Sequence, residues 1–122
     1  MRIRRIFTET TQNAYEGIAF HSVTSEIRNP DGSIVFRQEG IEVPAHWSQV
    51  ASDVLAQKYF RRAGVARALK KFEEHDVPSW LWRSVPDEAA LALMPEKERF
   101  AGEVSARQVF DRLAGTWTYW GW

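Results

Sequence analysis

Residues 24–33 have the sequence TSEIRNPDGS, and this stretch decides the fold of the first third of the chain. Within it, Pro30 presets φ for the start of a turn and Gly32 accepts a positive φ, so residues 29–32 predict a tight turn. The flanking stretches Val23–Ile27 and Ser33–Gln38 are rich in β-branched and aromatic residues with partial alternation. The pattern therefore predicts an antiparallel β-hairpin.

Further elements follow from the same reasoning on either side of this hairpin. An edge strand at Ile3–Phe7 would extend the sheet to about residues 3–38, and Val43-Pro44 would end it. A helix over about residues 46–62 is predicted by apolar residues at three-and-four spacing, namely Trp47, Val50, Ala51, Val54, Leu55 and Tyr59.

Two more helices are predicted at about residues 86–94 and 105–120, with Ser105 as the cap of the second and a short helix conceivable at Ala66–Glu74. Neither a repeat nor a flexible linker interrupts the sequence. We therefore expect one α+β domain over residues 1–122, a small antiparallel sheet packed by helices.

Composition narrows the function classes. The chain has 122 residues, 16 basic and 16 acidic side chains, and no cysteine. The balanced charge creates no overall field that would attract nucleic acid or an anionic membrane. The missing cysteine excludes disulfides, thiolate metal sites and thiol chemistry within these residues. No apolar run approaches the ~20 residues that cross a bilayer, and no signal peptide is evident, so we expect a cytoplasmic protein.

No catalytic or metal-binding residues are predicted. The histidines His21, His46 and His75 are far apart in sequence and lack the spacing of metal ligands. The acidic pairs Glu73-Glu74 and Asp87-Glu88 occupy consecutive positions, which diverge on a helix and favour solvated or helix-start roles.

Basic residues near aromatic ones leave a nucleic-acid-binding module open as a weaker hypothesis. They are Arg61, Arg62, Lys70 and Lys71, beside Tyr59, Phe60 and Phe72. Helix-end cations whose stems cover the core explain the same pattern more simply. Oligonucleotide binding that weakens steeply with salt would support the module.

Tryptophans are the most distinctive residues. The six are predicted to serve packing or an interface: Trp47, Trp80, Trp82, Trp117, Trp120 and Trp122. Three of them crowd the last six residues, where chains are normally polar. We expect the native polypeptide to continue past Trp122 and cover these rings; the alternative is a terminal helix folded back onto its own core.

Five strings of the chain resemble a known family. They are residues 24–33, 43–50, 55–65, 78–86 and 107–117, and in this order they resemble the amino-terminal region of the adenosylcobalamin-dependent (class II) ribonucleotide reductases. The resemblance covers most of the chain and rests on long strings of bulky residues.

The resemblance implies an amino-terminal domain that precedes a catalytic α/β barrel in a cytosolic, homodimeric enzyme. Such enzymes reduce ribonucleotides, here expected to be diphosphates, with adenosylcobalamin, a protein thiyl radical and a thioredoxin-like reductant. This chain has no cysteine, so no catalytic, cobalamin or substrate residue is transferred onto it. A free-standing protein-binding module that keeps the reductase-like domain stays open as the alternative.

Overall fold

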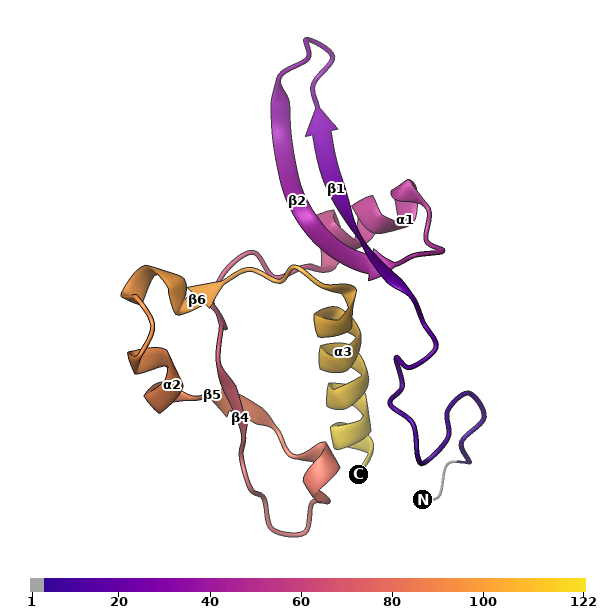
Figure 1. Cartoon of the computed structure of the whole chain (residues 1–122), viewed down its shortest axis with the longest axis vertical. Helices are drawn as coiled ribbons and strands as arrows, with labels where there is room; N and C mark the ends of the chain where they lie inside the picture. Colours follow the sequence, from indigo (N-terminus) through magenta and orange to yellow (C-terminus); the bar gives the residue numbers. More distant parts are fainter. Residues whose placement is uncertain (1–3) are drawn as a thin grey trace.

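A computed structural model describes residues 4–122, and a long β-hairpin projects from one end of it (Figure 1). Helices and two short two-stranded sheets, β3-β6 and β4-β5, form the remainder of the described residues. The elements in chain order are β1 (Phe20–Arg28), β2 (Ile34–Pro44), α1 (Gln49–Val54), η1 (Leu55–Tyr59), β3 (Val65–Ala66), β4 (Leu69–Lys71), η2 (Ser79–Leu81), β5 (Ser84–Pro86), α2 (Glu88–Ala92), η3 (Glu96–Glu98), β6 (Phe100–Ala101) and α3 (Ala106–Gly121). The α+β class is confirmed.

The predicted hairpin is confirmed and is longer than expected. Strands β1 and β2 pair from Phe20↔Pro44 to Arg28↔Ile34. In the turn, the amide of Gly32 donates to the carbonyl of Asn29 at 2.9 Å, and Gly32 has φ +87°. The strand ends at the expected Val43-Pro44 break, with Pro44 as the last residue of β2. Proline is tolerated at the end of this strand because no further ladder donor is needed there.

The edge strand expected at Ile3–Phe7 is not formed by residues 4–7. Ile3 lies outside the described residues, and Arg4–Phe7 are not in a strand. Ile6 and Phe7 are 78% and 95% exposed, so no apolar burial within residues 4–122 stabilises pairing there. The hairpin sheet therefore covers residues 20–44 instead of about 3–38.

The core lies where α1, η1 and the first turns of α3 meet the base of the hairpin. Its buried members are Ile41, Val43, Leu55, Ala56, Phe60, Ala106 and Val109. Trp47 and Phe110 pack against this core, with their rings edge to face at 5.7 Å. Burial of these side chains joins elements that are distant in sequence, and this provides most of the hydrophobic stabilisation.

The helix expected at about 46–62 is shorter than predicted, and its second half is π-helical. Ser48 caps α1 by accepting a hydrogen bond from the amide of Ala51 at 3.2 Å. Residues Leu55–Tyr59 then form a π-helical turn, closed where the amide of Phe60 donates to the carbonyl of Leu55 at 3.1 Å.

Carbonyls at the end of η1 find partners outside the helix. The carbonyl of Gln57 accepts from Arg62 at 3.1 Å, and that of Tyr59 accepts from Arg112 at 2.9 Å. These side-chain donors replace the bonds that a continuing helix would supply, so the helix can end here.

The remaining helical predictions have mixed outcomes. The helix at Ala66–Glu74 is wrong: β4 lies there and pairs with β5, from Leu69↔Pro86 to Lys71↔Ser84. The helix at 86–94 shortens to α2, which Asp87 caps. The helix at 105–120 is confirmed as α3, with a capping box between Ser105 and Gln108. Over residues 4–122, every helix is too short or too polar to span a bilayer.

Two valines test where the core lies. Val109 is 1% exposed in α3, whereas Val50, on the predicted apolar face of α1, is 71% exposed. Val109→Ala should lower the free energy of unfolding by about 1–3 kcal/mol because it removes buried methyl groups and leaves a cavity. Val50→Ala should change it by less than about 0.5 kcal/mol. Urea denaturation of both variants measures this, and equal losses would contradict the observed packing.

Candidate functional site

The six tryptophans divide into two groups by exposure. Trp47 is half-buried against the core, and half-buried Trp82 donates from Nε1 to the carbonyl of Val77 at 2.9 Å. The other four are mostly exposed: Trp80 at 67%, Trp117 at 64%, Trp120 at 76% and Trp122 at 67%. We call these four the aromatic face. Their rings are therefore not folded back into the core, which was the alternative left open from the sequence.

The carboxyl end of α3 is anchored to the segment between β4 and β5. The hydroxyl of Tyr119 donates to Glu74, which also forms an ion pair with Arg83. The hydrogen bond from Tyr119, followed by that from Arg83, lowers the pKa of Glu74 below its ordinary value. The indole of Trp122 donates to the carbonyl of Asp76 at 3.1 Å. This end of the helix is thus fixed by polar bonds.

Two rings of the aromatic face touch across this anchor. Trp80 on η2 and Trp122 lie edge to face with centroids 6.3 Å apart. Trp117 and Trp120 are three residues apart on α3, a spacing that places them on neighbouring positions of the helix surface. The arrangement presents large, amphipathic rings to solvent, the kind of surface that marks an interaction site.

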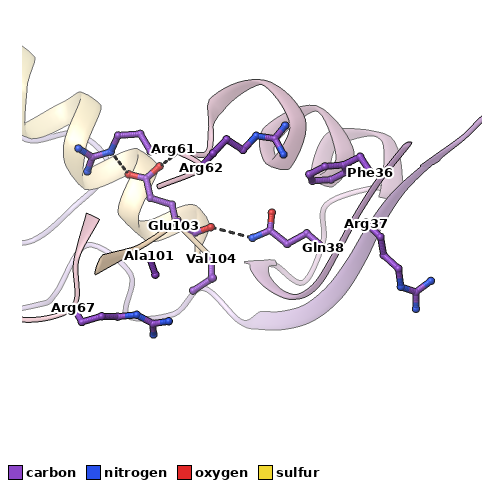
Figure 2. A pocket seen from close by; sticks show the side chains of 10 residues that line it. Phe36, Arg37, Gln38, Arg61, Arg62, Arg67, Ala101, Glu103 and Val104 are labelled. Atoms are coloured by element: carbon purple, nitrogen blue, oxygen red, sulfur yellow. Dashed lines mark hydrogen bonds and ion pairs between the residues drawn. The ribbon is translucent and has the colours of Figure 1, made fainter. Parts of the chain in front are cut away.

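A second cluster surrounds the buried carboxylate of Glu103, which is 1% exposed (Figure 2). Arg61 donates to it twice, from the backbone amide at 2.9 Å and from Nε at 3.0 Å. Arg112 donates from Nε and Nη2, both at 3.0 Å, one to each carboxylate oxygen. Both oxygens are therefore satisfied by charged or amide donors, as a buried carboxylate requires.

Opposing effects act on the pKa of Glu103. Burial raises the pKa because it disfavours the charged form, but hydrogen bonds from Arg112 and Arg61 and the charge of Arg112 outweigh burial, so the pKa lies below its ordinary value. Glu103 is therefore ionised at neutral pH. It joins the segment after η1 to α3, and the hairpin is added by Gln38, which donates to the backbone carbonyl of Glu103 at 3.1 Å.

The three histidines, which the sequence did not favour as metal ligands, are not brought together by the fold. The histidines His21, His46 and His75 are all exposed and lie on separate segments. Among residues 4–122, no three His, Asp or Glu side chains gather closely enough to hold a metal ion.

Some residues of the acidic pairs and of the basic groups have structural partners. Asp87 accepts from the amide of Ala90 as the cap of α2, and Lys71 donates to the carbonyl of Trp82. Phe60 is 5% exposed, so it cannot stack on a nucleic-acid base. The nucleic-acid hypothesis therefore loses one of the aromatic residues on which it rested.

Glu103 was missed at the sequence level. The only hint is an acidic residue in the stretch FAGEV, residues 100–104, where its neighbours are apolar or small. A single carboxylate in such a stretch does not reveal that Arg61 and Arg112 will meet there, because both partners come from other segments.

Comparison with known proteins places the chain in a family. Residues 21–122 match the family model described as class II vitamin B12-dependent ribonucleotide reductase. Over all 122 residues, the chain is 69% identical to the vitamin B12-dependent ribonucleotide reductase of Bradyrhizobium diazoefficiens and 66% identical to that of Agrobacterium fabrum. A 64-residue part, 52% of the chain, is 34% identical to 7% of the protein of that name from Streptomyces coelicolor.

The fold and its clusters define a small α+β module with a buried ion-pair cluster and four exposed tryptophans on or beside one helix end. The chain belongs to the class II vitamin B12-dependent ribonucleotide reductase family, as an amino-terminal segment, and the resemblance seen in the sequence is confirmed. It spans about 10% of the length of the two full-coverage relatives.

Neither the histidines nor the depression beside Glu103 fits cobalamin. The histidines are exposed and scattered, and the depression has a volume of about 260 Å³, below the range of about 300–1,000 Å³ typical of organic-ligand pockets. No step of cobalamin chemistry is derived from these residues.

Replacing the buried carboxylate should destabilise the fold in a pH-dependent way. We expect Glu103→Gln to cost about 2–4 kcal/mol at pH 7, less than a fully dry ion pair because Arg61 and Arg112 keep contact with solvent. Since the folded pKa is lowered, the stabilisation is present above the unfolded pKa and is lost as pH falls through the folded pKa.

Urea midpoints from pH 7 to pH 2.5 measure this effect. The difference between wild type and Glu103→Gln should be constant near neutrality and shrink below the ordinary glutamate value of 4.5. Glu73→Gln, at an exposed position, is the matched control and should leave the midpoint nearly unchanged. A difference that grows on acidification would contradict the assignment.

Gly102 allows a close backbone approach beside Glu103. A Cβ at Gly102 would lie 2.8 Å from the carbonyl oxygen of Arg62 and 3.0 Å from that of Arg61. We therefore expect Gly102→Ala to destabilise the fold by about 1–3 kcal/mol. Gly115→Ala, in α3 with open space around it, should instead stabilise by about 0.5–1 kcal/mol. Thermal unfolding of both variants gives the comparison; equal shifts would refute it.

Proposed function

We propose that this chain is the amino-terminal structural segment of a vitamin B12-dependent ribonucleoside-diphosphate reductase, an enzyme that makes deoxyribonucleotides for DNA synthesis. In this proposal the segment itself catalyses nothing. Family membership supports the assignment, and the absence of cysteine supports the structural role, because neither a thiyl radical nor a reducing dithiol can form on these 122 residues.

The rest of the enzyme follows from the same assignment. The complete protein would be a cytoplasmic homodimer that uses adenosylcobalamin and a thioredoxin-like reductant, with its chemistry in an α/β barrel downstream. Two relatives named vitamin B12-dependent ribonucleotide reductase are about ten times as long as the stretch they share with this chain, which supports a larger catalytic body.

The aromatic face carries the proposed structural role. Four tryptophans that are 64–76% exposed lie on or beside a helix end that Tyr119 and Trp122 anchor firmly. Burying such rings against another surface is strongly favourable, since each can remove roughly 150–250 Å² from water. We infer that the downstream barrel of the same polypeptide covers Trp80, Trp117, Trp120 and Trp122.

One tryptophan tests this docking. Trp117→Ala should lower the stability of the longer polypeptide by about 3–5 kcal/mol, as for a buried large-to-small change. In the isolated 122-residue chain the same change should cost less than about 1 kcal/mol, because the ring is 64% exposed. Phe7→Ala, at a ring 95% exposed outside the aromatic face, is the control and should be nearly neutral in both. Equal small losses from Trp117→Ala in both proteins would contradict docking.

A free-standing protein-binding module is the second candidate, because the same exposed rings could grip a separate partner. The coding sequence distinguishes the two. A reading frame that continues past Trp122 into cysteine-containing barrel strands supports the reductase segment, whereas a stop codon directly after Trp122 supports the binding module.

A further inference from the structure

An open depression lies beside the Glu103 cluster, between the hairpin and the residues that flank β3 and β6. Its volume is about 260 Å³, and its lining includes Phe36, Gln38, Arg61, Arg62, Arg67 and Gly102 (Figure 2). Nothing in the proposed structural role uses it. Its concave shape and concentration of guanidinium groups in a chain of zero net charge call for a separate explanation.

The arginines in and around the depression differ in whether they form an ion pair with a carboxylate. Arg61 and Arg112 share the carboxylate of Glu103. Arg37 also lines the depression, but its side chain is turned away from it and pairs with Glu26 and Glu39 (Figure 2).

Arg62 and Arg67 are different. Within residues 4–122, no carboxylate forms an ion pair with either of them. Two positive charges therefore remain to attract an anion, while Glu103 is already neutralised by its own arginines.

The fold holds the side chain of Arg62 and the backbone of Arg67, the two arginines without a carboxylate partner within residues 4–122. Arg62 donates to the carbonyl of Gln57 at 3.1 Å, and its guanidinium lies 4.4 Å from the centre of the Phe36 ring. The backbone amide of Arg67 donates to the carbonyl of Arg99 at 2.9 Å, directly after the β3–β6 pairing. Figure 2 shows the two side chains on opposite sides of Glu103 and Gln38. The fixed position of the Arg62 guanidinium lowers the entropy lost when an anion is bound.

We propose that this depression binds an oxyanion of phosphate chemistry between Arg62 and Arg67. Guanidinium groups match phosphate oxygens with paired N–H donors and keep their charge at every physiological pH. The small volume suits a phosphate or diphosphate group better than an acidic peptide, which would need an extended groove. The bound group is either free phosphate or the phosphate end of an organic molecule.

Site-resolved chemical labelling tests the proposal in the polypeptide at its natural length. Phenylglyoxal modifies accessible guanidinium groups, and mass spectrometry measures modification at each arginine. Inorganic pyrophosphate should slow modification of Arg62 and Arg67 at least about threefold, because bound oxyanions occupy their donors, and should leave Arg28 on the hairpin unaffected. Equal protection of Arg28, no protection of Arg62 and Arg67, or their complete inertness without ligand would each overturn the proposal.

Matched charge variants give an independent measurement by calorimetry. The double variant Arg62→Gln with Arg67→Gln should weaken one pyrophosphate-binding event about tenfold or more, since hydrogen bonds to charged groups are lost. The control, Lys70→Gln with Lys97→Gln, removes two positive charges outside the depression and should retain that event. Equal weakening in both double variants would show a general charge effect and refute a defined site.

Two comparisons distinguish the source of the oxyanion. Tighter protection of Arg62 and Arg67 by phenyl phosphate than by inorganic phosphate would assign the site to a phosphorylated organic molecule, and the reverse order would assign it to free phosphate. Both outcomes support the proposal. Protection by an oligoaspartate peptide without protection by either phosphate would replace it with an acidic protein segment as the ligand.

Discussion

The buried carboxylate of Glu103 is the constraint on which the arrangement of the other elements depends. Four donors from Arg61 and Arg112 reach its two oxygens, and its backbone carbonyl accepts from Gln38. A buried charge without such partners costs several kcal/mol, so the segment after η1, the start of α3 and the hairpin must all keep their positions at once. The apolar core beside it provides burial, but apolar contacts alone tolerate more than one arrangement. The directional bonds to Glu103 favour this one.

The two ends of α3 follow different physical rules. Its first turn is buried through Ala106 and Val109 and capped by Ser105, whose hydroxyl also donates to Glu42 at 2.6 Å. Its last turns are held mainly by polar bonds, from Tyr119 to Glu74 and from Trp122 to the carbonyl of Asp76. Large rings that would normally provide burial are therefore left outside the fold. The helix is stable at one end by packing and presents a surface at the other.

Local chemistry explains which features could be predicted from the sequence. The Asn29–Gly32 turn and the Ser105 cap depend on residues within four positions of one another, and both were predicted. The strands β3 to β6 have two or three residues each and depend on partners 13 to 36 positions away, so a local pattern such as that of 66–74 suggested a helix instead. The π-helical turn was missed because Arg112, which satisfies the carbonyl of Tyr59, is 53 positions distant. The number of tryptophans was evident, but their division into half-buried and exposed rings depends on tertiary contacts. The same holds for Glu103, whose role only the meeting of three segments reveals.

Two carboxylates with a lowered pKa, Glu74 and Glu103, fix the end of α3 and the segments beside the depression. Glu103 and Glu74 stay ionised at neutral pH because their hydrogen-bond donors outweigh the cost of their burial. Around Glu103 the same arrangement leaves Arg62 and Arg67 without a carboxylate partner inside residues 4–122, and beside Glu74 it leaves four indole rings exposed. A chain without cysteine cannot contribute a thiol to radical chemistry, but it can contribute rigid surfaces. Arg62 is held by its hydrogen bond to Gln57 and by the Phe36 ring, and the end of α3 is held by the bonds of Tyr119 and Trp122. Less ordering is therefore needed when a partner or an anion binds, and more of the interaction energy remains as affinity.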